Sequence, residues 1–194
     1  ARRGAGITGV DDLRGRRVGI GPSGSGTALT SGIVLDAFGI RPAAVTAVPV
    51  SFSDVERLLG EGTLDAAFVN AGYPAESIAK ATVGGAELLP VVGPRVDRIR
   101  ADYPFFRQTF IPPGTYPNQV GAVPTIGVDN LLLCRADLPE TLVYQLTRAH
   151  FQGVPELSSK RISLRMMDLE SAPATPVPLH DGAARYYREL ELTR

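Results

Sequence analysis

The chain has 194 residues, a formal net charge of zero and a hydrophobic content of 44%. This composition is typical of a folded globular protein and argues against disorder. Proteins that bind nucleic acid usually present a basic surface, so the balanced charge argues against a nucleic-acid partner. No apolar run is long enough to span a membrane, and residues 1–10 lack the apolar core of a signal peptide. The sequence therefore predicts a cytosolic protein, a mature form or a fragment. The lone cysteine, Cys134, excludes an intrachain disulfide, and its apolar neighbours are typical of a buried side chain.

Strands and helices alternate in the first half of the chain. In chain order the predicted elements are a strand over 16–21, a helix from Ser25 to Gly39, a strand over 45–50, a helix with a capping box at Ser53–Glu56 that ends at Gly60, a strand over 64–70, a helix over 74–81 with Pro74 in its first turn, and a strand over 86–92. This order predicts an α/β fold whose mostly parallel sheet has helices on both faces.

The second half of the chain changes character. Residues 105–134 contain strand-like runs that proline and glycine interrupt. An amphipathic helix is predicted over 139–152, and a turn followed by a terminal helix over 178–190. These elements no longer repeat the strand–helix alternation.

A glycine-rich stretch, "VGIGPSGSGT", follows the first predicted strand. Gly19, Gly21 and Gly24 match the dinucleotide fingerprint, but no acidic residue ends the next strand to bind a ribose. Gly21, Gly26 and Thr27 approach a phosphate-binding P-loop, but the lysine that precedes the threonine in that motif is missing. Both nucleotide interpretations are therefore weak.

The same stretch suits a simpler anion site. Gly24 and Gly26 let the backbone approach a ligand, while Ser23, Ser25 and Thr27 offer hydroxyl groups. The helix that follows offers unpaired N–H groups and a partial positive charge, which favour a carboxylate or phosphate without a lysine. The alternative is that the hydroxyl groups only cap the helix.

Five segments in a fixed order give the chain a family resemblance. They are "DDLRGRRVGIGPSGSGT", "LDAAFVNAGYP", "IPPGTYPNQ", "ETLVYQLTRA" and "PLHDGAARYYRE". Together they resemble solute-binding proteins of TRAP transporters, specifically the TAXI family. The resemblance implies a type II periplasmic-binding-protein fold, in which two α/β lobes close on a small solute. Residues 10–122 then form the second lobe, and residues 123–194 form a return strand and C-terminal helices that belong to the first lobe or hinge.

The resemblance also implies a function. It predicts a non-enzymatic, cofactor-free, extracytoplasmic or periplasmic subunit that binds a small carboxylate, such as a dicarboxylate or the amino acid glutamate, and delivers it to TRAP membrane subunits. Most of the family's first lobe has no counterpart in this sequence, which indicates a truncated chain or a short paralogue. A lobe without its partner exposes apolar surface, so self-association is expected.

Four further residues are candidate ligand contacts. Asn70 ends a predicted strand, where its amide would meet a carboxyl or amino group, or would form an Asx turn. Tyr73 would stack on a solute or fill a loop corner. Thr115 and Tyr116 lie in a proline-rich loop that would contact the ligand or shape the fold.

Catalytic and metal sites are poorly supported. Ser25 and His180 would need an aspartate to form a triad, Cys134 and His150 would form a dyad, and neither set has a nucleophile-elbow signature. No cluster has the spacing of metal ligands. Two rival functions stay open: an α/β enzyme or regulatory domain that uses the glycine-rich loop for a nucleotide or phosphate, and a degenerate receptor that serves as an interaction module.

Overall fold

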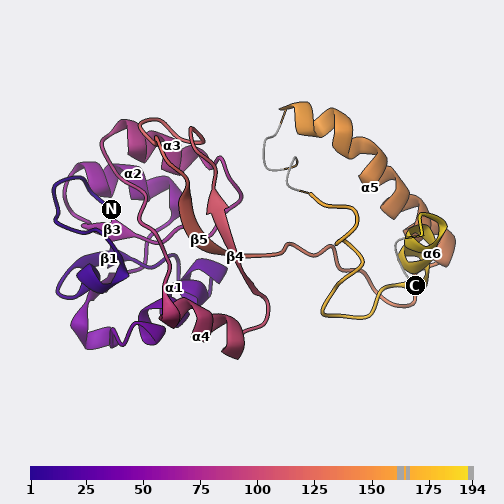
Figure 1. Cartoon of the computed structure of the whole chain (residues 1–194), viewed down its shortest axis with the longest axis horizontal. Coiled ribbons are helices and arrows are strands. Elements are labelled where there is room, and N and C mark those ends of the chain that lie inside the picture. The colour runs from indigo at the N-terminus through magenta and orange to yellow at the C-terminus, as the bar shows by residue number, and fades with distance from the viewer. Residues whose placement is uncertain (161–163, 165–166, 192–194) are drawn as a thin grey trace. The chain divides into compact units, whose positions relative to one another are not determined.

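The computed structural model describes the chain except residues 161–163, 165–166 and 192–194 (Figure 1). Its chain divides into two compact units, Ala1–Asp129 (unit 1) and Asn130–Arg194 (unit 2). The sequence places a boundary between residues 122 and 123, but the strand that begins at Val123 stays in unit 1 because it pairs with the strand before it. The assignment of 10–122 and 123–194 to two lobes remains a prediction.

Unit 1 is built on a three-stranded parallel sheet with the order β2-β1-β3. Its strands are β1 (Arg17–Gly19), β2 (Thr46–Val48) and β3 (Ala66–Ala67). The helices of the unit are α1 (Gly26–Ala37), α2 (Phe52–Gly60), α3 (Glu76–Val83) and α4 (Pro94–Asp102), with short 3-10 turns at Val10–Leu13 and Pro42–Ala44. An antiparallel hairpin of β4 (Phe106–Ile111) and β5 (Val123–Val128) completes it.

Helices cover both faces of the parallel sheet. Consecutive strand residues point to opposite sides of the sheet, so neighbouring residues of β1 contact different helices. Val18 of β1 is fully buried in a cluster that includes Val34 of α1 and Ile99 of α4. Its neighbour Gly19 faces Val50 and the buried cluster of α2 and α3. The predicted α/β fold, with a parallel sheet and flanking helices, is confirmed.

Unit 2 consists of two described helices, α5 (Glu140–Lys160) and α6 (Asp181–Glu189). The Phe151 ring of α5 stacks on Tyr186 of α6, with 5.9 Å between centroids and an 8° interplanar angle. His180 caps α6, since its Nδ1 accepts from the Gly182 N–H at 3.1 Å while its Nε2 lies 3.1 Å from the Leu138 carbonyl oxygen. Because Nδ1 accepts, Nε2 carries the proton and donates to that carbonyl. Among the described residues, no helix is long and apolar enough to cross a membrane.

Three sequence predictions about local structure are wrong. Residues 86–92 form no strand, because Ala86 makes only an isolated bridge to Arg2, and Val91 makes a single bond to the Pro124 carbonyl. Helix α2 begins at Phe52 with Ser51 as its N-cap, so the predicted capping box at Ser53 lies inside the helix.

The third error concerns Pro74. It precedes α3, whose N-cap is Ala75, and so lies outside the first helical turn. Two further expectations also change. Cys134 is exposed instead of buried, and α5 continues past residue 152 to Lys160 with Pro155 inside it.

Candidate functional site

The candidate site lies where three loops leave the parallel sheet. Because β1, β2 and β3 run in the same direction, their carboxyl ends meet at one edge. The loop after β1 holds the glycine-rich stretch, the loop after β2 leads into Ser51, and the loop after β3 holds Asn70 and Tyr73. Sequence reasoning identified the first and third loops and omitted the second.

The N-terminus of α1 offers unpaired donors. Ser25 is the N-cap, and its Oγ accepts from the Ala28 N–H at 3.1 Å. The N–H groups of Gly26 and Thr27 belong to the first turn, where a helix has no internal acceptor. Ser23, Gly24 and Gly26 are exposed, so solvent reaches this end of the helix.

Helix α1 also differs from the other described α-helices in its charge pattern. Its first turn contains no acidic residue, whereas each of the other helices has one there. Those residues are Asp54, Glu76, Asp97, Glu140 and Asp181. An acidic side chain at this position balances the partial positive charge of a helix N-terminus. At α1 no side chain does so, and an external anion can.

Thr27 and Asn70 join the first and third loops. The Asn70 N–H donates to Thr27 Oγ1 at 3.3 Å, and its side-chain amide donates to Thr30 Oγ1 at 3.2 Å. Thr27 is only 3% exposed, so its hydroxyl holds the loops together beneath the surface. Gly21 makes this possible: it has φ of +86°, and a Cβ there would lie 2.6 Å from the Thr27 Cβ.

The loop after β2 adds the hydroxyl group of Ser51, which was not among the predicted site residues. Ser51 Oγ donates to Asp54 Oδ2 at 2.6 Å and lies 2.7 Å from Ser53 Oγ. The Ser51 hydroxyl and then the Arg57 guanidinium lower the pKa of Asp54, so its carboxylate is ionised at neutral pH. The signal that could have found this turn is the Ser51–Asp54 spacing, which competes with the spacing of Ser53 and Glu56.

The proline-rich loop supports α3 from beside the third loop. Tyr116 is 3% exposed, and its hydroxyl accepts from the Ala75 N–H at 2.9 Å, just beyond Tyr73. Burial raises the pKa of Tyr116, so the phenol is neutral. The Thr115 hydroxyl donates to the Pro112 carbonyl oxygen at 2.7 Å. The hydroxyl groups of Thr115 and Tyr116 thus bond to protein atoms. The Tyr73 side chain is half-buried.

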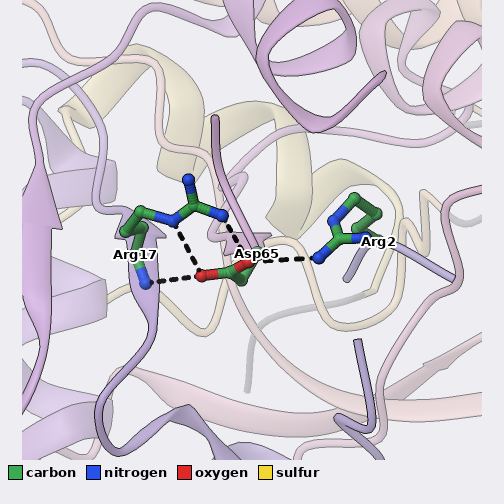
Figure 2. Close-up of polar contacts among 3 residues, drawn as sticks. All are labelled: Arg2, Arg17 and Asp65. Atoms are coloured by element: carbon green, nitrogen blue, oxygen red, sulfur yellow. Dashed lines mark hydrogen bonds and ion pairs between the residues drawn. The ribbon is translucent and has the colours of Figure 1, made fainter. Parts of the chain in front are cut away.

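A buried carboxylate fixes the opposite end of the sheet strands (Figure 2). Asp65 directly precedes β3, and its side chain is 9% exposed. Its Oδ2 accepts from both the backbone N–H and the Nε of Arg17 at 3.0 Å, and its Oδ1 accepts from Arg17 Nη2 at 2.7 Å and Arg2 Nη2 at 3.3 Å. The Arg17 guanidinium holds the pKa of Asp65 far below its usual range. This cluster ties residues 2, 17 and 65 together and supports the strands that carry the candidate site.

The structure gives little support to catalytic arrangements. The Ser25 hydroxyl caps α1, and the His180 imidazole caps α6. In the part of the chain that the structure describes, no group of three or more His, Cys, Asp or Glu residues could hold a metal ion. Ser23, Gly24, Ser25, Gly26, Thr27, Asn70, Tyr73, Thr115 and Tyr116, the nine predicted ligand residues, carry no charge.

The parallel sheet and its flanking helices are compatible with one class of protein, the periplasmic-binding-like α/β domains. A family model supports the same class and matches residues 1–190. The chain belongs to the NMT1-like family. This is a family of solute-binding proteins that are typically extracytoplasmic, so membership implies a small-molecule ligand.

Proposed function

We propose that this chain is a non-enzymatic, extracytoplasmic solute-binding subunit of a TAXI-type TRAP transporter and that it binds a small carboxylate, a dicarboxylate or an amino acid such as glutamate. The observation that carries the proposal is the N-terminus of α1, which is exposed and has no acidic residue in its first turn. Membership of a solute-binding family supports a small ligand. The five sequence segments that resemble the TAXI family support the transporter type.

In this proposal the nine candidate residues have two roles. Ser23, Gly24, Ser25 and Gly26 contact the carboxylate through hydroxyl and N–H groups, because they are the solvent-accessible part of the loop. Asn70 and Tyr73 contact the remainder of the solute from the third loop. Thr27, Thr115 and Tyr116 are positioning residues, since their hydroxyl groups bond to protein atoms. TRAP membrane subunits are the proposed partners of the loaded protein.

A charge placed at the α1 N-terminus tests the proposal. Gly26 lies at the first helical position, and a Cβ there would meet only the Asn70 side-chain amide, at 4.0 Å. Gly26→Asp therefore adds a carboxylate where the ligand carboxylate would bind, without a steric clash. We expect succinate or glutamate affinity to fall about tenfold or more. The added carboxylate and the ligand carboxylate would share one site, where like charges repel by about one to several kcal/mol.

The matched control is Gly32→Asp, which adds the same charge to an exposed position of the same helix with no atom within 4 Å. Calorimetry should show nearly unchanged carboxylate affinity for this variant. An equal loss in both variants would contradict binding at the α1 N-terminus. Binding of ATP or NAD, with no binding of carboxylates, would instead favour the nucleotide-binding alternative.

A further inference from the structure

A second feature of unit 1 lies apart from the proposed solute site. A cavity of about 180 Å³ opens beside β3, between α2, α3, the segment 87–91 and the β4–β5 hairpin. None of the nine candidate solute residues lines it. A ligand in this cavity would therefore contact none of those nine residues.

The lining of the cavity is predominantly apolar. Leu59 comes from α2, Ile78 and Ala81 from α3, Leu89 from the segment 87–91, and Ile111 from β4. Alanine at position 81 leaves space where a larger side chain would fill the interior. Contact with this wall favours a hydrocarbon surface over a hydrated one.

Polar groups at the wall have hydrogen-bond partners within the protein. The Glu87 carboxylate accepts from Arg3 Nε at 2.8 Å, and the Ala1 nitrogen donates to the Glu87 carbonyl oxygen at 2.7 Å. The Thr82 hydroxyl donates to the Ala79 carbonyl oxygen at 2.9 Å. A charged ligand would lose part of its hydration against this predominantly apolar wall, so the lining favours an uncharged molecule.

The volume limits the size of the occupant. An apolar cavity of about 150 Å³ in another protein stays dry and binds benzene. We propose that the cavity beside β3 is a binding site for one small, uncharged hydrocarbon group of the size of benzene or toluene. This site is additional to the solute site and does not depend on the proposed transport function.

Toluene and benzoate test the proposal, because they share a ring and differ in charge. In ¹H–¹⁵N spectra of the full chain, toluene should cause saturable shifts at the amides of Ala81 and Leu89, and benzoate should bind at least tenfold more weakly. Absence of saturable toluene shifts up to its solubility limit would overturn the proposal. Equal affinities for benzoate and toluene would overturn it too. Spectra that show contacts between residues 87–91 and 66–69 would also overturn it, because such contacts would close the cavity.

Variants of the lining give a second test. Ala81→Leu fills the cavity and should reduce toluene affinity at least tenfold, whereas Val83→Leu, at a position of α3 that is 70% exposed and outside the lining, should leave it unchanged. Ile111→Ala enlarges the cavity, so it should shift the preference from toluene toward p-xylene at least threefold. If Ala81→Leu does not fold, an unchanged preference in Ile111→Ala refutes the proposal.

Discussion

Asp65→Asn should destabilise unit 1 more than any neutral surface substitution. The carboxylate accepts four hydrogen bonds, three of them from Arg17 and one from Arg2 (Figure 2). An asparagine keeps one acceptor oxygen, but its NH₂ group would face donors that now bond to Oδ2. Hydrogen bonds to charged groups contribute about 1.5–3 kcal/mol each.

Asp65→Asn should not lose the full free energy of the two hydrogen bonds that Oδ2 accepts. The side chains of Arg2 and Arg17 are 39% and 44% exposed, so water can replace part of the lost interaction. The expected loss in the free energy of unfolding is therefore about 2–3 kcal/mol at neutral pH. The control Asp97→Asn changes a carboxylate that is 69% exposed and pairs with Arg100 at 3.6 Å. It should stay within about 0.5 kcal/mol of the wild type.

The pH dependence of unfolding provides a separate check on Asp65. Its pKa is lower in the folded protein than in the unfolded chain, so its stabilisation is fully present above the unfolded pKa near 3.8 and is lost as the pH falls below it. Urea titrations at pH 7 and pH 3, read from the amide signals of Val18 and Ala66, report the stability of unit 1. A loss below 0.5 kcal/mol in Asp65→Asn, or an acid dependence equal to that of the wild type, would refute this reasoning.

Two further predictions concern unit 2 and are read from its helical circular dichroism during urea unfolding. Gly182→Ala should destabilise the α5–α6 packing by several kcal/mol, because its Cβ would lie 2.3 Å from the Glu140 carbonyl oxygen. Gly153→Ala, whose Cβ would meet only one side-chain atom at 3.9 Å, should stabilise α5 by up to about 1 kcal/mol. Equal effects of Gly182→Ala and Gly153→Ala would contradict the close contact between α5 and α6. His180→Ala should lose about 1 kcal/mol with the helix cap, while His180→Asn should retain most of it. Equal losses in the two histidine variants would mean that the cap contributes nothing.

Local sequence signals predicted the elements that carry the candidate site. The glycine and hydroxyl residues before α1 fixed its start, because Ser25 is a favourable N-cap and Gly21 and Gly24 permit positive φ. The alternation of apolar strands and helices predicted the parallel sheet, whose central strand β1 buries Val18 and Gly19 between the helices on the two faces. The carboxyl edge of that sheet then followed from the strand direction.

The errors arise where two local patterns compete or where pairing depends on distant residues. Ser51 and Ser53 both precede an acidic residue by three positions, and the helix begins after Ser51, whose hydroxyl donates to Asp54 Oδ2 at 2.6 Å. Residues 86–92 have the apolar character of a strand. They make only an isolated bridge and single backbone bonds to other segments, and β3 pairs with β1 instead of with them. The buried contact between Tyr116 and Ala75 joins segments 41 residues apart, so no local pattern could predict it.

In the proposed function, neutral donors at the α1 N-terminus bind a small carboxylate. The most direct measurement is a titration of the ¹⁵N-labelled chain with succinate and glutamate, observed at the amides of Gly24, Gly26 and Thr27. We expect saturable shifts at these amides for at least one of the two acids, and much weaker shifts at the same concentrations in Gly26→Asp. Shifts confined to other parts of unit 1, or shifts of these amides caused by ATP and not by either acid, would contradict the claim.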